Sequence, residues 1–390
     1  MNIVFLFSDN FPGSSAYSNR IHSLAKGLIH HGNEVEVSVV YPGNWAESNE
    51  LAGKRGIYNT VPFNYYCAPK FKPKSRILQV IVGVWGIIHF FIHWLFKFGK
   101  DKPDYIIACS SSLMHLSVLY VLAKIKGIKI LREYNEYPKF ILRKSNYFAK
   151  TARYRLLDGF VFMTKRLEVF FKEDLKMNQK SIIVNMTVDT DRFDSSITKA
   201  EESCNRITMV GDILGEKDGV GNLISSFVII HKVFPSLKLV LVGNISDSKS
   251  YEKRIAKVKV LGLNNFVEFT GNVSRDEIPA LMRQSRLLLL PRPSSLQAES
   301  GFPTKIGEYL SSGTPVVVTD TGEISNFLVD METSFIVEPN NVEAFAKKVI
   351  FALENPILAK QIAAGGKRCA LESFDYIEQT QLLNQFLKSF

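Results

Sequence analysis

The sequence has 390 residues, of which 46% are hydrophobic and 22% charged, a balance that excludes a disordered chain and suffices for two ordinary domains. The net charge of +10 is unevenly spread, because residues 1–195 hold 27 Lys and Arg against 16 Asp and Glu. This excess indicates an anionic partner of the first half, nucleic acid or acidic lipid, or else a generally basic proteome. The scattered cysteines lack the spacing of a zinc site, so we predict free thiols, a reducing compartment and no metal: Cys67, Cys109, Cys204 and Cys369.

The first segment reads as a strand, a loop and a helix. Its apolar run, Ile3–Ser8, has no basic region before it, which favours a first strand over a signal peptide and predicts a cytoplasmic protein. The loop Asp9–Ser18 follows at the carboxyl end of this strand, where ligands of parallel sheets bind. A helical pattern and a second strand, Glu34–Val40, complete a βαβ unit and indicate a doubly wound sheet. The candidate phosphate or acceptor contacts of the loop are Gly13, Ser14 and Ser15.

Residues Ile77–Phe98 are apolar over nearly the ~20 residues that a membrane span requires. Small and polar residues recur every three or four positions, which predicts a helix with one distinct face. An interior helix of the first domain is one interpretation. The other, which we favour, is an amphipathic helix on the inner-membrane surface, flanked by the cations of Lys70–Arg76 and by lysines after it. The rings expected to enter the bilayer are Trp85, Phe91, Trp94 and Phe96.

The rest of the first half alternates between strands and helices. The expected strands are Tyr105–Cys109, Lys129–Arg132, Gly159–Met163 and Ser181–Asn185. The expected helices are Leu113–Lys124 and Thr164–Lys172. Glu133 and Glu136 follow one of these strands and so lie at the same sheet edge as the first loop. Two interpretations stay open for them, ligand contacts at this edge or a surface pair of carboxylates.

The second half restarts the same alternation, which predicts a second α/β domain. Its expected strands are Ile207–Gly211, Lys238–Gly243, Val267–Thr270, Arg286–Leu290 and Pro315–Thr319. Its expected helices include Gly221–Val233 and Asp276–Gln284. The polar stretch Asp194–Ser203 is the predicted linker. We therefore expect domains at 1–195 and 196–375, followed by a helical segment at 376–390.

Residues 291–318 combine a loop, a short helix and a buried strand. Two prolines and a serine pair keep the start irregular, Lys305–Leu310 has a helical pattern, and Val316–Val318 resumes as a strand. The helix is expected to begin near Phe302–Thr304, where unpaired N–H groups and the positive dipole end suit a diphosphate. Glu308, one turn further, offers two acceptor oxygens to the vicinal hydroxyls of a ribose. The segment therefore predicts a sugar-nucleotide site.

The same segment resembles the donor-site signature of the retaining family-4 glycosyltransferases of GT-B architecture, the glycosyl transferases group 1. The matching residues are Gly301, Phe302, Pro303, Glu308, Gly313, Pro315 and Val316. The resemblance implies two Rossmann-like domains that face each other across a cleft. It also implies these donor-binding residues: Glu299, Ser300, Gly301, Phe302, Pro303, Thr304, Lys305 and Glu308. Ser300 stands where the family usually has its first glutamate, and F-P-T-K marks a subgroup in which Lys305 is a candidate phosphate or sugar contact.

Residues Met209–Gly219 resemble the family's strand and loop in which an arginine and a lysine bind the donor diphosphate. Lys217 matches the lysine, whereas Asp212 occupies the arginine position. Arg292 is our candidate for the missing cation, or else a solvated loop residue. Two glycines at strand ends are expected to let the backbone approach the donor: Gly211 and Gly243.

The resemblance implies transfer of a sugar from a nucleotide-diphosphate donor to a saccharide or polyprenyl-linked acceptor, with retention at the anomeric carbon. We expect UDP- or GDP-linked donors in preference to ADP-linked ones, a role in cell-surface polysaccharide biosynthesis, and no metal or cofactor. The expected catalytic residues are Lys217, Arg292 and Glu308. In similar sequences the first loop lies at the interdomain cleft, residues 131–138 line the acceptor side, and the C-terminal helix crosses back to the first domain.

Two rival functions stay open. A sugar-nucleotide epimerase of the same architecture would bind the same donor and release an altered sugar nucleotide without an acceptor. An inactive sugar-nucleotide-binding scaffold is the other, and it is suggested by Ser300 and Asp212. An oxidoreductase is disfavoured because the first loop lacks G-x-G-x-x-G. No recognised motif supports nucleic-acid binding.

Overall fold

The computed structural model describes residues 1–13, 15–41, 54–67, 73, 75–97, 99–109, 113–138, 151–194 and 205–390. The chain divides into two compact units. The first comprises Met1–Thr187 together with Tyr376–Phe390, and the second comprises Val188–Asp375. The sequence placed this boundary at 195/196. Apart from Asp194, the predicted linker lies outside the described residues.

The first unit is built on a sheet that has eight strands within the described residues, in the order β3-β4-β2-β1-β5-β6-β7-β8. Neighbouring strands pair in parallel, apart from the antiparallel pair of β3 and β4. The strands are β1 (Asn2–Phe7), β2 (Glu34–Val39), β3 (Arg55–Tyr58), β4 (Val61–Tyr65), β5 (Tyr105–Ala108), β6 (Lys129–Tyr134), β7 (Gly159–Phe162) and β8 (Lys180–Ile183). The principal helices are α1 (Ala16–His30), α3 (Arg76–Leu95), α4 (Leu113–Lys126), α7 (Lys165–Val169) and α17 (Tyr376–Lys388).

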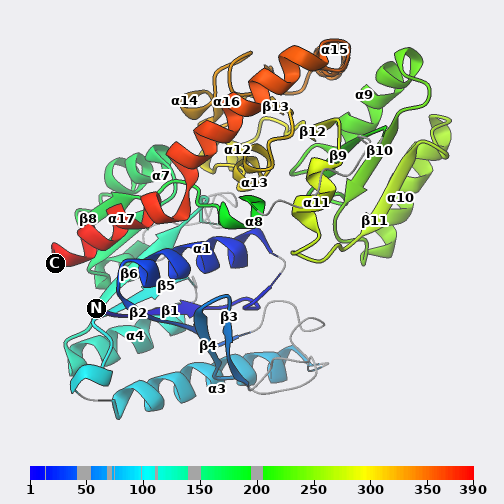
Figure 1. The fold of residues 1–390 in the computed structure, drawn as a ribbon. Coiled ribbons are helices and arrows are strands. Elements are labelled where there is room, and N and C mark those ends of the chain that lie inside the picture. Colours follow the sequence, from blue (N-terminus) through cyan, green and yellow to red (C-terminus); the bar gives the residue numbers. More distant parts are fainter. Residues whose placement is uncertain are drawn as a thin grey trace. The chain divides into compact units, whose positions relative to one another are not determined.

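The central strands of this sheet are buried on both faces, which explains why β1, β5 and β7 consist mostly of apolar residues. In β1, Ile3, Phe5 and Phe7 enter one hydrophobic cluster, whereas Val4 and Leu6 enter another. Figure 1 shows α1 and α17 on one side of the sheet and α3 and α4 on the other. Side chains of each helix pair belong to the cluster on their side. The first unit is therefore doubly wound, as the sequence predicted.

The C-terminal helix α17 packs closely on α1 within the first unit. A Cβ added to Gly27 of α1 would clash with Thr380 of α17, so only glycine permits this approach. Nearby, Asn33 Nδ2 donates a hydrogen bond to Asn384 Oδ1 at 3.0 Å. The chain end is thus part of the first unit although it follows the second in sequence.

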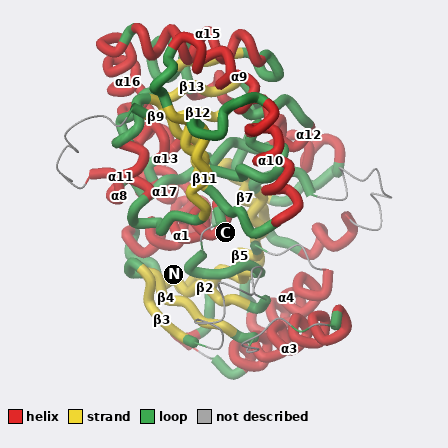
Figure 2. The backbone as a smooth tube through the Cα atoms, turned by 90° about the vertical axis from the view of Figure 1, so that its right-hand side faces the viewer, coloured by secondary structure: helices red, strands yellow, loops and turns green. Residues whose placement is uncertain are grey.

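The second unit contains a parallel sheet that has six strands within the described residues, in the order β11-β10-β9-β12-β13-β14. The strands are β9 (Arg206–Val210), β10 (Lys238–Val242), β11 (Val267–Gly271), β12 (Leu287–Leu290), β13 (Val316–Thr319) and β14 (Phe335–Val337). The helices are α8 (Asp191–Asp194), α9 (Val220–Val233), α10 (Ser248–Val260), α11 (Ile278–Arg283), α12 (Leu296–Ser300), α13 (Lys305–Ser311), α14 (Ile324–Phe327), α15 (Val342–Glu354) and α16 (Pro356–Phe374). Figure 2 shows the strands of each unit, in yellow, flanked by helices in red.

Two of the four aromatic rings that the sequence assigned to a bilayer are not available to it. Trp94 is buried in the core, and Phe91 packs against the same cluster, because this side of α3 covers the sheet. Trp85 and Phe96 are 62% and 70% exposed. Among the cations expected before the helix, Lys70, Lys72 and Lys74 lie outside the described residues.

Candidate functional site

The donor segment of the second unit contains two short helices instead of the single helix predicted. Ser295 caps α12 by accepting a hydrogen bond from the Ala298 N–H at 3.1 Å, a local signal that sequence reasoning overlooked. The second helix, α13, begins at Lys305, directly after the predicted start. It has seven residues, and the N–H of Ile306 already donates to the carbonyl of Pro303. Its first turn thus offers fewer N–H groups to a diphosphate than the sequence suggested.

Lys305 extends from α13 to a buried carboxylate that sequence reasoning missed. Its Nζ lies 2.8 Å from Asp218 Oδ2, and Asp218 is 4% exposed. Burial alone would raise the pKa of Asp218, but Lys305, the N–H of Asp212 and the charge of Arg292 together lower it. The carboxylate is therefore ionised at neutral pH, and its stabilising effect is lost only as the pH falls through that lowered pKa.

Glycines at the strand ends make room for this ion pair. A Cβ on Gly211 would lie 2.7 Å from Asp218 Oδ2 and 2.9 Å from Lys305 Nζ. Gly243 is adjacent, because a Cβ there would clash with the carbonyl of Gly211. The structure thus gives Gly211 and Gly243 a packing role at the positions where the sequence predicted donor contacts.

Replacing Gly219 by alanine is expected to destabilise the second unit. This residue caps α9 in the left-handed region, with φ of +78°, and a Cβ would clash with the carbonyl of Pro291. Backbone strain and overpacking together predict a loss of about 2–4 kcal/mol in the free energy of unfolding. The matched control is Gly262→Ala, since Gly262 has φ of +70° with nothing within 4 Å of its added Cβ. Denaturant unfolding of both variants should show the larger loss for Gly219→Ala, and equal losses would contradict the packing role.

Glu308 lies one turn after Lys305 on α13 and is also ion-paired. Its Oε1 is 2.9 Å from Nη1 of Arg192 in α8, and the Glu308 side chain is 17% exposed. Arg192 is held in turn, because its Nη2 donates to the carbonyl of Arg275 at 2.6 Å. Sequence reasoning missed Arg192, which lies 116 positions from its partner. Residues three apart on a helix share one face, so Lys305 and Glu308 project from the same side of α13.

The two cations that the sequence assigned to the diphosphate, and Asp212 at the position of the missing arginine, lie in different surroundings. Lys217 is exposed, whereas Arg292 is only 3% exposed and is not the solvated loop residue of the alternative interpretation. Asp212 is exposed and its Oδ1 accepts a hydrogen bond from the N–H of Gly215, which shapes the loop before α9. Arg292 acts on the pKa of Asp218, so it belongs to the same charged cluster as Lys305.

Some predicted donor contacts instead hold the loop in place. Phe302 is 4% exposed and packs in a three-ring cluster with Phe327 and Phe374, at centroid distances of 5.4 and 5.3 Å. The ring of Phe302 is thus a core contact, and its role as a donor contact stays a prediction. Ser300 is fully buried, and its Oγ donates to the carbonyl of Gln297. The remaining predicted contacts are buried or half-buried in the same segment: Glu299, Gly301, Pro303 and Thr304.

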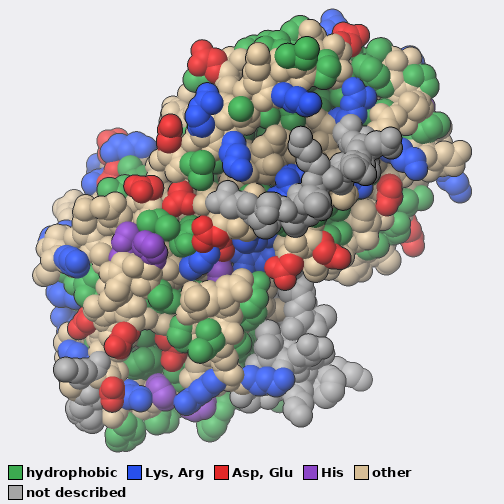
Figure 3. Space-filling model, viewed as in Figure 1, with side chains coloured by type: hydrophobic (Ala, Val, Ile, Leu, Met, Phe, Trp, Pro, Cys, Tyr) green, Lys and Arg blue, Asp and Glu red, His purple; other side chains and the backbone are tan. Residues whose placement is uncertain are grey.

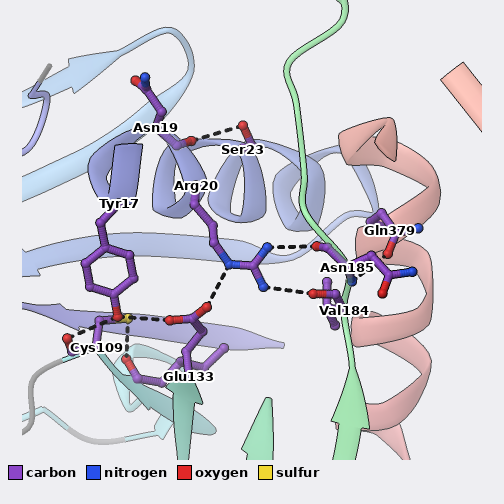
Figure 4. A network of polar contacts seen from close by, with 10 residues as sticks. Tyr17, Asn19, Arg20, Ser23, Cys109, Glu133, Val184, Asn185 and Gln379 are labelled. Carbon is purple, nitrogen blue, oxygen red and sulfur yellow. Dashed lines mark hydrogen bonds and ion pairs between the residues drawn. The ribbon is translucent and has the colours of Figure 1, made fainter. Parts of the chain in front are cut away.

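In the first unit, Glu133 belongs to a buried polar network rather than to an open sheet edge (Figure 4). Its Oε1 lies 2.7 Å from Nε of Arg20, and its Oε2 accepts a hydrogen bond from the Tyr17 hydroxyl at 2.9 Å. Arg20 also donates to the carbonyls of Asn185 and Val184. Both carboxylate oxygens are therefore engaged inside the unit, so Glu133 is not a surface carboxylate, and its role as an acceptor contact stays a prediction.

The first loop is organised around the start of α1. Ser15 is the N-cap, since its Oγ accepts from the N–H of Ser18 and donates to Asp9 Oδ2. A Cβ on Gly13 would lie 2.6 Å from the carbonyl of Asn10, so this turn requires glycine. Ser14 lies outside the described residues, and Glu136 is half-buried. The described part of the chain has no cluster of three or more His, Cys, Asp and Glu side chains that could hold a metal.

Solved structures share the fold of this chain over its whole length. Sucrose-phosphate synthase of Thermosynechococcus elongatus aligns with a TM-score of 0.75 and 14% identity, covering 100% of this chain and 98% of that one. Anabaena Alr3699/HepE, solved with UDP-glucose, aligns with a TM-score of 0.73 and 17% identity, covering 100% of both chains. WaaG, a glycosyltransferase involved in lipopolysaccharide biosynthesis, aligns with a TM-score of 0.70 and 14% identity, again covering 100% of both chains. The fold is GT-B. The fold class predicted from the sequence, two Rossmann-like doubly wound domains, is thus confirmed.

The second unit of this GT-B chain also matches at the sequence level. Residues 191–368 match the family described as Glycosyl transferases group 1. Uncharacterized glycosyltransferase MJ1178 of Methanocaldococcus jannaschii is 27% identical over 57% of this chain and 57% of its own length. The 2-deoxystreptamine glucosyltransferase of Streptomyces kanamyceticus is 26% identical over 51% of this chain and 52% of its own length. The chain covers little more than half the length of these curated relatives.

Proposed function

We propose that the protein is a retaining glycosyltransferase that moves a sugar, such as a hexose, from a nucleotide-diphosphate donor to a saccharide or lipid-linked acceptor. One observation carries this proposal. Lys305 and Glu308 share one face of α13, inside the region that matches the glycosyl transferases group 1. An ammonium and a carboxylate one helical turn apart suit the diphosphate and the ribose of one nucleotide. The relative Alr3699/HepE, solved with UDP and UDP-glucose, favours a UDP-linked donor.

Donor binding uses the two ion pairs described above. Lys305 has three N–H donors, and Asp218 takes one of them at 2.8 Å, so the ammonium is held in place with donors left for phosphate oxygens. Arg192 holds the Glu308 carboxylate in the same way through Oε1. Preorganised charges bind better than mobile ones, because less side-chain entropy is lost on binding. Asp218 and Arg192 are thus positioning residues for the donor site.

The transfer step breaks the bond between the anomeric carbon and the β-phosphate oxygen. A new bond forms from that carbon to the acceptor hydroxyl oxygen on the same face, and the departing phosphate oxygen takes the acceptor's proton. Negative charge that develops on the diphosphate is stabilised by Lys305, Arg292 and Lys217. These cations supply the charge stabilisation that a divalent metal would otherwise provide, and we propose that the reaction requires none.

The acceptor is proposed to be a saccharide or polyprenyl-linked saccharide of a cell-surface polysaccharide, reached from the cytoplasm. A relative named lipopolysaccharide 1,2-N-acetylglucosaminetransferase, of Salmonella typhimurium, is 23% identical over 70% of this chain and 73% of its own length. The first unit carries the whole excess of positive charge, which suits an acceptor that is anionic or lies on an anionic membrane.

A thermal-shift screen of UDP, GDP, ADP and their sugars tests donor binding. We expect a rise in melting temperature for UDP or GDP compounds and a much smaller rise with Glu308→Gln, which keeps an acceptor for Arg192 but loses the charged diol contact. Absence of a shift with every nucleotide would contradict the proposal. An altered sugar nucleotide released without acceptor would identify an epimerase, and binding without turnover in any acceptor mixture would indicate a scaffold.

A further inference from the structure

The solvent side of α3 carries a continuous apolar stripe. Ile77, Ile81, Trp85, Ile88 and Ile92 follow one another at spacings of three or four residues and are each 41% to 72% exposed. The stripe continues at the helix end and is flanked by further exposed apolar residues: Phe96, Leu78 and Val80. In Figure 3, hydrophobic side chains in green lie along the lower edge, where Figure 1 places α3. A soluble monomer rarely exposes so extended an apolar patch without a partner.

The opposite side of α3 is part of the protein core. Ile87, Phe90 and Trp94 belong to a cluster formed with the sheet, and a Cβ on Gly86 would clash with the carbonyl of Val40. By length and composition α3 could cross a membrane. Surrounding it with lipid would, however, require pulling this buried face away from the sheet. The packing therefore favours a helix that lies along a bilayer surface.

Charge identifies the kind of surface. Residues 51–100, which contain β3, β4 and α3, include no Asp or Glu. The same 50 residues contain eight cations: Lys54, Arg55, Lys70, Lys72, Lys74, Arg76, Lys97 and Lys100. Arg76 and Lys97 lie at the two ends of α3, so the apolar stripe runs between positive charges. An apolar face between cations matches the interface of an anionic bilayer.

We propose that α3 docks the first unit on an anionic lipid bilayer, with the helix axis in the membrane plane and Trp85 at the level of the headgroups. This inference rests on the proposed function in one respect: the docking would bring the first unit to a lipid-linked acceptor. The docking surface itself is defined by α3 alone.

Vesicle flotation tests the docking surface. We expect the protein to float with vesicles of phosphatidylcholine and phosphatidylglycerol, and to float at least tenfold less with phosphatidylcholine alone. Ile81→Ser with Trp85→Ser should lower binding at least tenfold, and Arg76→Glu with Lys97→Glu should remove the preference for anionic lipid. The matched control is Val260→Ser with Ile357→Ser, since these side chains of the second unit are 87% and 77% exposed. The control should bind like the wild type.

Quenching of tryptophan fluorescence by brominated lipids tests the orientation. Lipids brominated near the headgroup should quench the wild-type protein, and Trp85→Phe should remove most of that quenching.

Three results would overturn the inference: no flotation, equal flotation of the α3 variants, or resistance to alkaline carbonate, which would indicate a span. A dimer that breaks with Ile81→Ser and Trp85→Ser, without vesicle binding, would assign the stripe to a second copy. The thermal shift with nucleotides is measured without vesicles, so the donor proposal can fail or hold separately.

Discussion

Lys305→Met is expected to lower kcat/KM for sugar transfer by about 100-fold, because it removes a positioned cation from the departing diphosphate. Initial rates at varied donor concentration measure the effect. The matched control is Lys348→Met, which removes a lysine of the same unit with nearly equal exposure, 25% against 23%, from an ion pair of equal length, 2.8 Å. The control should keep the wild-type kcat/KM.

A second variant separates the effect on the transfer reaction from the effect on the stability of the fold. Lys305→Met leaves Asp218 buried without its ammonium partner, and this alone destabilises the second unit. Lys305→Arg keeps the positive charge and should recover part of the lost kcat/KM. A folded Lys305→Met protein with unchanged kcat/KM would contradict the assigned role, and so would an arginine variant as inactive as the methionine one.

Arg20→Met is expected to lower the free energy of unfolding by about 3–5 kcal/mol, since it leaves the carboxylate of Glu133 buried without its cation. The two side chains are 1% and 0% exposed, and Arg20 also satisfies two backbone carbonyls of the first unit. Denaturant unfolding followed by circular dichroism measures the change. Lys129→Met is the control, because the side chains of its ion pair with Asp158 are 48% and 32% exposed and little change is expected.

The double variant Arg20→Met with Glu133→Leu sharpens this prediction. It removes both charges, so it should be more stable than Arg20→Met alone. A loss below about 1 kcal/mol for the single variant would contradict the stabilising role of this buried ion pair.

The strands that the sequence predicted well are those buried on both faces. Leu287–Leu290 is an uninterrupted apolar run, and Val316–Thr319 is apolar up to its last residue, so both can be recognised without knowledge of their neighbours. The hairpin of β3 and β4 was missed because β3, Arg55–Tyr58, contains a charge and a glycine and alternates between exposed and half-buried positions. Its pairing with β4 is what makes it a strand.

The sequence pointed to residues of the candidate site but not to the ion pairs that hold them. Lys305 and Glu308 were identified from their positions on a short helix, whereas their partners Asp218 and Arg192 lie 87 and 116 positions away in sequence. A residue type and a spacing indicate chemistry within one segment. They do not show which distant residue brings the opposite charge, and for that reason the ion pair of Glu133 with Arg20 was missed as well.

The position of a nucleotide in a crystal structure of the complex is the most direct test of the donor site. The nucleotide should be the one that gives the largest thermal shift. We predict its diphosphate within hydrogen-bond distance of Lys305 Nζ and its ribose hydroxyls on the carboxylate of Glu308. A nucleotide bound elsewhere, with Glu308 still paired only to Arg192, would contradict the proposed site and the function derived from it.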